Sequence, residues 1–387
     1  MTRVLVVCMF DSIHTARWLS QFTQNREIEI ILFPSRKFRH LNPALRDLLR
    51  TRCNISLSQF HRGIPLFFLG YYSFFKFNLL ARVLRKDVKE IQSRALRNIL
   101  NSLLPNIIHA LEIQGAGYLL SMALINAVKP KKRILTNWGS DIYFYGREEF
   151  EGLRIRKVLL EFTHYSAECQ RDYELALKFG FKGEFLPCIP NAGGIEVSKI
   201  KATSTLSSSR HLLIVKAYGG KFGLGLLAVS ICAEILKTMQ SPHIYFYSVT
   251  DDVKSEVIAL CKRFPGRVGY STVRKSLPHD EFIEKLKTAR CYLGMSKSDG
   301  ISTSFLESIA YGVFPIQTDT SCAAEWIDLG AVGFITNSDD RVGIVLKIQE
   351  IFSENRVVDE AQLKNREIAL KHLSFGHVMS NSLLFYQ

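Results

Sequence analysis

Two carboxylates, a glycine and two hydroxyl side chains lie close together in the second half of the sequence. The stretch 296–319 reads SKSDGISTSFLESIAYGVFPIQTD, in which Glu307 follows Asp299 by eight positions. Between the acids come residues that expose backbone N–H groups or cap a helix, namely Gly300, Ser302 and Thr303. A free helix N-terminus binds phosphate, and a carboxylate accepts paired hydrogen bonds from sugar hydroxyls. The spacing therefore predicts phosphate at the helix N-terminus, a sugar on Asp299 and a ribose on Glu307.

The elements around this stretch are expected to hold it at the edge of a sheet. CYLGM (291–295) is typical of a buried strand, and FPIQT (314–318) begins the next strand after a helical pattern. Gly312 suits the end of that helix, where a left-handed backbone is wanted. In open α/β sheets, ligands bind beyond the carboxyl ends of strands. An acidic loop followed by an exposed helix glutamate is the alternative interpretation.

Short apolar runs alternate with helical patterns along the whole chain, which is typical of parallel sheets in doubly wound α/β domains. The polar, Ser/Thr-rich stretch 196–210 predicts a linker between a first domain over 1–195 and a second over 211–365. A C-terminal helix at about 366–387 is expected to pack back on the first domain. The expected strands are RVLVVC (3–8), IEIILF (28–33), NIIHAL (106–111), RILTNW (133–138), THYSA (163–167), HLLIVK (211–216), HIYFYS (243–248), RVGYS (267–271), CYLGM (291–295) and FPIQT (314–318).

The bulk composition narrows the class of protein. The formal net charge of +14 and the sequence pI of about 9.4 predict an anionic partner, which a nucleic acid, an anionic membrane or a phosphorylated substrate would satisfy. No helix-turn-helix, RNP or zinc-finger pattern supports a nucleic acid. The eight cysteines form no C-x-x-C pair, so we expect buried free thiols and no zinc site. No signal peptide or run of 18 apolar residues is evident, so we expect a cytoplasmic protein without a membrane span.

Residues 59–89 combine many aromatic side chains with cations, and this segment has two interpretations. Either it lies on anionic lipid at the inner face of the plasma membrane, or it faces the core and leaves its cations in solvent. An apolar period near 3.6 that starts at Phe77 predicts one helix that runs through Leu103 and stops before Pro105. The cations are Arg62, Lys76, Arg82, Arg85, Lys86 and Lys89.

The stretch from Asp299 onward resembles the acid-x7-Glu motif of the retaining, nucleotide-sugar-dependent glycosyltransferases of family 4, which have the GT-B fold. The family form reads EGFG and then LEAMAxGxPVIATD. This sequence has Asp299 in place of the first Glu, and IST in place of FGx. The later positions match at Glu307, Gly312, Pro315 and Asp319.

Other segments resemble the same family, so the resemblance covers nearly the whole chain. DSIHTARWL (11–19) and NWGSDI (137–142) are similar to two strand-end loops of a subset of the family. KAYGGKFG (216–223) is similar to its phosphate loop, in which Lys221 fits the Lys-Gly position and Lys216 substitutes for the usual Arg. The segments ECQRDYELALKFGF (168–181) and LPCIPNAGG (186–194) resemble the helix and turn that close the first domain.

The resemblance implies two Rossmann-like domains that face a cleft, with the acceptor on the first and the donor on the second. It implies transfer of a sugar, with retention, from a UDP- or GDP-sugar to a lipid-linked or glycan hydroxyl in the synthesis of surface polysaccharide such as lipopolysaccharide or capsule. The nucleotide sugar is a co-substrate, and no cofactor is expected. No D-x-D sequence is present, so no metal is expected either. The implied donor-binding residues are Lys216, Lys221, Asp299, Gly300, Ser302, Thr303 and Glu307.

On the acceptor side the resemblance implies His109, His14 and Asp141 as catalytic residues. Family members often show H-x-H after the fourth strand, and Leu111 replaces the second histidine here. A structural role for His109 and a turn role for Asp141, bonded to its own backbone, stay open. The substitutions at positions 299 and 111 leave a second function open, namely a sugar-nucleotide-binding scaffold of the same fold without transfer activity.

Overall fold

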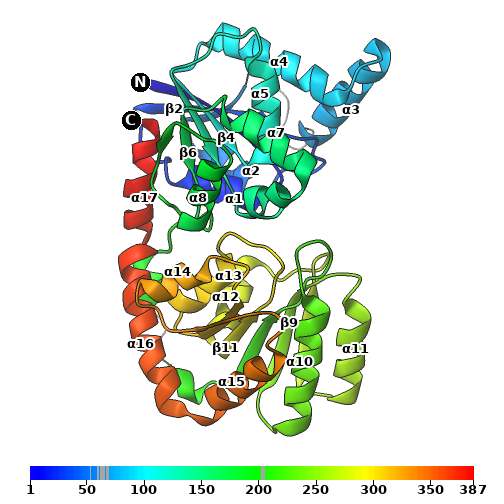
Figure 1. The fold of residues 1–387 in the computed structure, drawn as a ribbon, viewed down its shortest axis with the longest axis vertical. Coiled ribbons are helices and arrows are strands. Elements are labelled where there is room, and N and C mark those ends of the chain that lie inside the picture. The colour runs from blue at the N-terminus through cyan, green and yellow to red at the C-terminus, as the bar shows by residue number, and fades with distance from the viewer. Residues whose placement is uncertain (53, 59–60, 62–65, 67–68, 202–204) are drawn as a thin grey trace. The chain divides into compact units, whose positions relative to one another are not determined.

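The structure is a computed structural model that describes residues 1–387 except 53, 59–60, 62–65, 67–68 and 202–204. The chain divides into two compact units (Figure 1). Unit 1 comprises Met1–Gly193 together with Val378–Gln387, and unit 2 comprises Gly194–His377.

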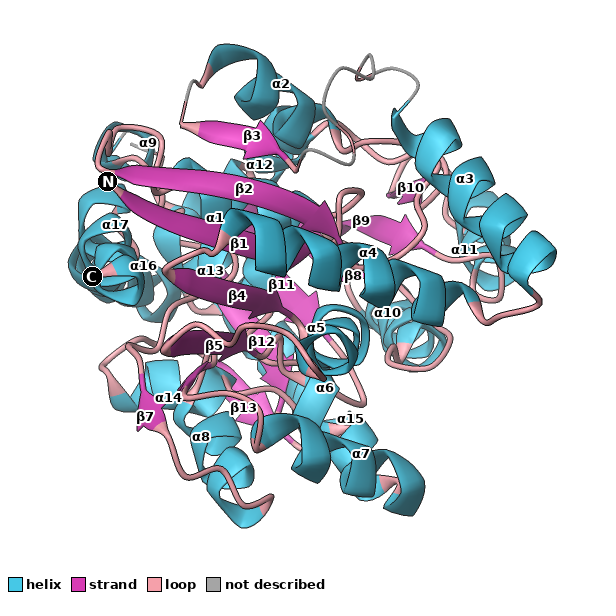
Figure 2. Ribbon diagram, turned by 90° about the horizontal axis from the view of Figure 1, so that it is seen from above, coloured by secondary structure: helices cyan, strands magenta, loops and turns pink. Residues whose placement is uncertain are grey.

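Each unit is built on one parallel sheet whose strand order reverses once. The order is β3-β2-β1-β4-β5-β6-β7 in unit 1 and β10-β9-β8-β11-β12-β13 in unit 2. Figure 2 shows β3, β2, β1, β4 and β5 in succession, with helices around them. Both units are therefore doubly wound and Rossmann-like, as the sequence predicts. The reversals lie between β1 and β4 and between β8 and β11, where ligands bind in such sheets.

The elements of unit 1 follow the predicted strands and add two short edge strands, β3 and β7. Its strands are β1 (Thr2–Cys8), β2 (Ile28–Pro34), β3 (Ile55–Leu57), β4 (Ile107–Leu111), β5 (Lys132–Thr136), β6 (His164–Ser166) and β7 (Glu184–Phe185). Its helices are α1 (Ile13–Ser20), α2 (Pro43–Thr51), α3 (Leu69–Leu84), α4 (Val88–Leu103), the π-helix η1 (Ile113–Gly117), α5 (Tyr118–Leu124), α6 (Ser140–Tyr143), η2 (Tyr145–Arg147), α7 (Glu149–Leu159) and α8 (Gln170–Lys178).

Unit 2 has the same alternation. Its strands are β8 (Leu212–Lys216), β9 (His243–Val249), β10 (Val268–Thr272), β11 (Ala289–Gly294), β12 (Phe314–Thr318) and β13 (Phe334–Thr336). Its helices are α9 (Val197–Lys201), η3 (Ser207–Ser209), α10 (Gly225–Thr238), α11 (Lys254–Arg263), α12 (His279–Lys287), α13 (Thr303–Ala310), α14 (Ala323–Asp328), α15 (Arg341–Ser353) and α16 (Asn355–His372). The chain then enters α17 (Phe375–Leu383) and η4 (Leu384–Tyr386).

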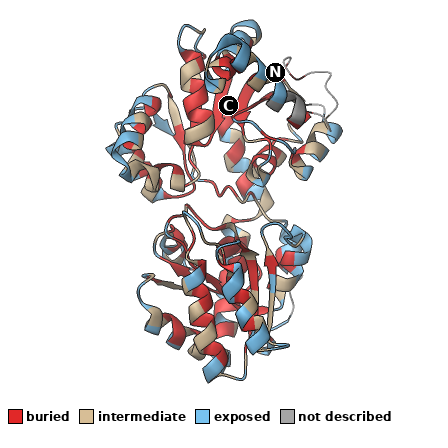
Figure 3. Cartoon of the chain, turned by 90° about the vertical axis from the view of Figure 1, so that its right-hand side faces the viewer, coloured by how far each residue is buried: buried red, intermediate tan, exposed pale blue. Residues whose placement is uncertain are grey.

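The sheet of unit 1 separates two apolar layers, because successive side chains of a strand point to opposite faces. Leu5 and Val7 of β1 face a layer that includes Phe77 of α3, whereas Val4 and Val6 face the layer of α1, α2 and the C-terminal segment. Figure 3 shows the central strands largely buried and the outer sides of the helices exposed. The described cysteines include buried free thiols in both units, as expected: Cys8, Cys169, Cys232, Cys291 and Cys322.

The long helix predicted from Phe77 to Leu103 is two helices in the structure. Helix α3 ends at Leu84, and Arg85 adopts a left-handed backbone with φ of 49°. Asp87 then caps α4, since its side chain accepts a hydrogen bond of 2.7 Å from the backbone N–H of Lys89. The prediction was wrong at this point because the apolar period continues across the break. In the sequence only the capping residue Asp87 indicates that a new helix begins.

The stretch 196–210, predicted as a linker, lies within unit 2 in its described part. The backbone N–H of Ser207 donates to Gln362 Oε1 at 2.8 Å. Arg210 is 4% exposed, and its guanidinium donates to backbone carbonyls that include those of Ala289 and Tyr311. Polar groups of this stretch therefore form hydrogen bonds within unit 2, whereas a linker would leave them in solvent. The chain changes unit at Gly193, and it returns to unit 1 at Val378.

Candidate functional site

Three of the predicted donor-binding residues meet where the strand order of unit 2 reverses. Strands β8 and β11 pair with Gly294 opposite Lys216, so the end of β8 lies beside the loop that follows β11. Lys216 Nζ lies 3.7 Å from Asp299 Oδ2 and 3.5 Å from Ser302 Oγ. The half-buried cation and carboxylate thus lie together at the N-terminus of α13.

The sequence predicts that a hydroxyl side chain caps α13, and the structure differs from this prediction at Ser302. Ser302 occupies the N-cap position, but within the described chain its side chain makes no capping hydrogen bond. Ser302 Oγ lies instead 3.3 Å from the hydroxyl of Tyr292, and it also faces Lys216. The first intrahelical bond runs from Leu306 N–H to Ser302 O. This geometry leaves the amides of the first turn to other acceptors, which is what an anion site needs.

Glu307 lies on the same helix, α13, and has a partner that the sequence pattern did not indicate. Glu307 is 5% exposed, and its Oε1 lies 2.7 Å from Nε2 of His279. His279 is the first residue of α12. The sequence gives one signal for His279. Helix α12 directly precedes the parallel strand β11, so the first residue of the helix lies at the carboxyl edge of the sheet. The exposed helix glutamate of the alternative interpretation is not what the structure contains.

The loop after β8 depends on its glycines. Gly220 has φ of 67°, and a Cβ on Gly219 would lie 2.1 Å from Asp252 Oδ2. The backbone N–H of Gly219 donates to Thr250 Oγ1, and that of Gly220 donates to Asp252 Oδ2 at 2.9 Å. Asp252 therefore holds the loop in place. Lys221 follows directly and is exposed.

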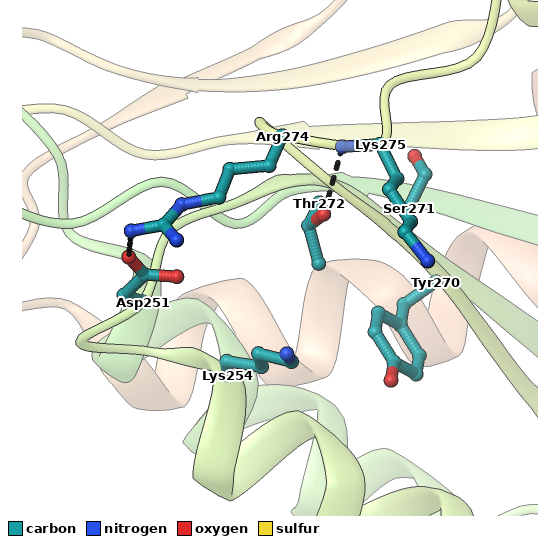
Figure 4. Close-up of a pocket in the computed structure, with 7 residues that line it drawn as sticks. All are labelled: Asp251, Lys254, Tyr270, Ser271, Thr272, Arg274 and Lys275. Carbon is teal, nitrogen blue, oxygen red and sulfur yellow. Dashed lines mark hydrogen bonds and ion pairs between the residues drawn. The ribbon is translucent and has the colours of Figure 1, made fainter.

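A cavity of about 530 Å³ lies at the carboxyl ends of β9 and β10 (Figure 4). Arg274 Nη2 lies 2.6 Å from Asp251 Oδ2 at its rim. None of the predicted donor-binding residues is among the described residues that line this cavity. The lining consists of Asp251, Lys254, Tyr270, Ser271, Thr272, Arg274 and Lys275, which gives it a net positive charge.

In unit 1, His14 and the loops after β5 and β7 come together. Ser12 caps α1 by accepting from the backbone N–H of His14 at 3.2 Å. His14 Nδ1 lies 3.4 Å from the carbonyl oxygen of Asn191, and its ring centroid lies 5.5 Å from that of Trp138. The segments 11–19, 137–142 and 186–194, which the sequence analysis singled out separately, therefore contribute to one part of unit 1.

Asp141 lies on α6 and is 8% exposed. Its Oδ2 accepts a hydrogen bond of 2.9 Å from the backbone N–H of Ile113, in the segment that follows β4. Burial, and then the nearby carboxyl of Glu112, raise the pKa of Asp141 to about 7. The carboxyl group therefore ties two strand-end loops together, and it also accepts from the backbone N–H groups of Trp138 and of Asp141 itself, as the turn role requires.

Glu112 is a second buried acid, and the sequence analysis passed over it. It combines φ of 83° with ψ of 153°, a backbone region that is almost restricted to glycine. Its side chain accepts hydrogen bonds from the backbone N–H groups of Gly115 at 2.8 Å and Ala116 at 2.5 Å, at the start of the π-helix. Burial raises the pKa of Glu112. No sequence pattern indicates that a glutamate adopts this backbone conformation, so Glu112 could not be predicted as a site residue.

His109 lies inside the core of unit 1 and is fully buried. Its Nδ1 lies 2.9 Å from the hydroxyl of Tyr386, and its Nε2 lies 2.7 Å from Thr136 Oγ1. Burial lowers the pKa of His109 to about 3, so its imidazole is neutral. Both ring nitrogens are thus held by side chains of the core. This geometry favours the structural role for His109 over contact with a substrate.

No helix of the described residues is long and apolar enough to cross a membrane. The predicted segment 59–89 is described only in part, and Arg62 lies outside the described residues.

Comparison with known proteins gives one family match and many structural matches. The family model described as "Glycosyl transferase 4-like" matches residues 72–168, which is about a quarter of the chain. No curated protein matches the sequence. The match falls in unit 1, whereas the acid-x7-Glu stretch that prompted the resemblance lies in unit 2.

Solved structures of glycosyltransferases cover the whole chain at low identity. HepE of Anabaena in complex with UDP-glucose has a TM-score of 0.67 at 12% identity and covers 99% of both chains. Sucrose-phosphate synthase from Thermosynechococcus elongatus has a TM-score of 0.70 at 10% identity and covers 100% of this chain and 98% of its own. A glycosyltransferase from Rickettsia africae has a TM-score of 0.65 at 10% identity, and the match covers 100% of this chain and 97% of its own. These matches show the fold and confirm the predicted resemblance to glycosyltransferases with the GT-B fold.

Proposed function

We propose that this chain is a glycosyltransferase that moves a sugar from a nucleoside-diphosphate sugar to an acceptor hydroxyl, with unit 2 as the donor-binding unit. The observation that carries the proposal is the contact of Lys216 with Asp299 and Ser302 at the uncapped N-terminus of α13. A cation and helix amides suit a diphosphate, and the neighbouring carboxylate suits a sugar. HepE of Anabaena, which shares the fold, binds UDP-glucose.

The reaction develops negative charge on the leaving diphosphate as the bond to the anomeric carbon breaks. In the proposed mechanism Lys216 and the amides of the first turn of α13 stabilise that charge, because preorganised donors contribute most where charge develops. Asp299 orients the hydroxyls of the donor sugar, and Glu307 binds the ribose. Gly300 lets the backbone approach the ligand closely, and Lys221 adds a second cation. Retention at the anomeric carbon remains an implication of the family resemblance.

We propose that no metal ion takes part, because acids near the donor site already have other roles. Asp251 forms an ion pair with Arg274, and Asp252 holds the glycine loop through Gly220. On the acceptor side, Asp141 and His14 are the proposed groups that contact the acceptor. His109, whose ring nitrogens both have partners inside the core, has no proposed contact with the acceptor. A scaffold that binds sugar nucleotides without transferring them remains the second candidate, because Asp299 is shorter than the glutamate of the family motif.

Binding of the donor tests the proposal directly. A ligand at 100 times its Kd stabilises the state that binds it by about 2.7 kcal/mol. For a unit of this size that corresponds to a rise in Tm of roughly 5–10 °C. We expect this rise with one class among UDP-, GDP- and ADP-sugars, and we expect Glu307→Gln to reduce it. Transfer to a membrane extract would then separate the enzyme from the scaffold, and no rise with any nucleotide sugar would refute both.

We also propose that the acceptor is lipid-linked and that α3 rests on an anionic membrane. One face of α3 is buried through Phe77 and Ala81. On the other face Phe75, Leu79 and Val83 are spaced by four residues and are 65%, 63% and 70% exposed. The same segment carries the cations Lys76, Arg82, Arg85, Lys86 and Lys89, of which Lys86 forms an ion pair with Glu90. An exposed apolar stripe with flanking cations fits the surface of anionic lipid.

Replacing Phe75, Leu79 and Val83 together with serine is expected to weaken binding to vesicles of phosphatidylglycerol and phosphatidylcholine about tenfold or more, because each side chain would lose burial in the lipid. Vesicle co-sedimentation at low and high salt measures the effect. Three residues of unit 2 with comparable exposure, replaced in the same way, provide the control: Val342, Leu346 and Leu363. Equal binding of wild type and the α3 variant would contradict membrane contact, and with it the proposed site at the inner face of the plasma membrane.

A further inference from the structure

The contact between His279 and Glu307 joins a buried acid to an exposed imidazole. The side chain of Glu307 is 6% exposed and that of His279 is 52% exposed, while Nε2 and Oε1 lie 2.7 Å apart. An ionised carboxylate only accepts hydrogen bonds, so Nε2 of His279 must carry the proton and donate it. His279 is the first residue of α12, and Glu307 lies on α13. The contact therefore lets a side chain of α12 hold the carboxylate of Glu307 in place.

This contact bears on how Glu307 could hold a ligand. A glutamate side chain has three rotatable bonds, and ordering it on binding would oppose affinity. A donor fixed on one oxygen orders the carboxylate beforehand. A carboxylate can accept about four hydrogen bonds, so the bond from His279 is compatible with additional donors from hydroxyl groups. The amino end of α12, where His279 lies, also favours negative charge nearby.

We propose that His279 is a positioning residue that orients the carboxylate of Glu307 for the two ribose hydroxyls of the donor nucleotide. The proposal rests on the proposed function, since it deepens the role assigned there to Glu307. His279 acts through Glu307, so its effect is confined to ligands that present ribose hydroxyls. A purely structural tie between α12 and α13 would instead affect every nucleotide equally.

Calorimetric titration with the one of UDP, GDP and ADP that the wild-type chain binds, written here as UDP, and with its 2′,3′-dideoxy analogue distinguishes these roles in the full chain. We expect His279→Ala to raise the Kd for UDP about tenfold, because a hydrogen bond to a charged group is lost. We expect the same variant to bind the dideoxy analogue as wild type does. His279→Gln should recover most of the affinity for UDP, because the glutamine amide N–H takes the place of Nε2–H. His211→Ala, an exposed histidine before β8, is the matched control and should bind as wild type.

Three results with His279→Ala would overturn the inference while leaving the proposed function intact: unchanged affinity for UDP, tighter binding of UDP, or an equal loss for UDP and the dideoxy analogue. Tighter binding would show that the imidazole competes with the ligand for Glu307. Failure of the wild-type chain to bind UDP, GDP or ADP would overturn the proposed function itself, and the inference with it.

Discussion

Replacement of Lys216 with alanine is expected to lower the turnover number of sugar transfer about 100- to 1,000-fold. Removing one preorganised donor from a site of developing charge has an effect of this order in other enzymes. Lys216 is half-buried, and its Nζ lies 3.5 Å from Ser302 Oγ at the N-terminus of α13. In the proposed mechanism it meets the leaving diphosphate there. Initial rates at saturating donor measure the effect, and Lys216→Arg should retain part of the activity because it keeps the charge.

Lys262→Ala is the matched control for this variant. Lys262 is an exposed lysine of the same unit, on α11, so its loss should leave turnover unchanged. The unfolding midpoint of Lys216→Ala should stay close to that of wild type, since its contact with Asp299 is long at 3.7 Å. A turnover number within about threefold of wild type would remove Lys216 from the catalytic site.

The second large effect concerns stability. Phe385→Ala is expected to lower the free energy of unfolding of unit 1 by about 3–5 kcal/mol, the usual range for a buried phenylalanine. Phe385 is fully buried, and its ring centroid lies 4.8 Å from that of Trp18. For a unit of this size the loss corresponds to a fall in Tm of roughly 10 °C. Calorimetry of the full chain measures it, with added nucleotide to mark the transition of unit 2.

Leu384→Ala provides the control within the same turn of helix. Leu384 is 43% exposed, so its truncation removes little buried surface. An equal and small effect of both substitutions would contradict the packing of the C-terminal segment against α1. A shift in the transition that nucleotide stabilises would contradict the assignment of Phe385 to unit 1.

The strands and their order in the chain follow from the sequence because buried parallel strands are continuous apolar runs. β1 and β11 are examples, since RVLVVC and CYLGM have no helical period. The break at Arg85 does not follow, because the apolar residues keep their period through it. Short edge strands such as β7, with two residues, bury too little to leave a pattern.

The candidate site was predictable where neighbours in the sequence form it, and not where distant residues meet. Asp299 and Ser302 follow one strand, so their proximity follows from local order. The pairing of His279 with Glu307 joins residues 28 positions apart, and no local pattern encodes it. The burial of His109 depends on Thr136 and Tyr386, which lie on another strand and in the last turn. Only the folded structure shows that both ring nitrogens have partners.

The hydroxyl of Tyr386 also has a consequence for how the protein is made. It lies 2.9 Å from His109 and 3.1 Å from Trp18 Nε1, so the core of unit 1 contains a residue that the ribosome adds only after all of unit 2. Domains generally fold as units, N-terminal first, during synthesis. In this protein residues 378–387 complete the core of unit 1, so we expect the apolar surface around Trp18 to stay exposed until those residues have left the ribosome.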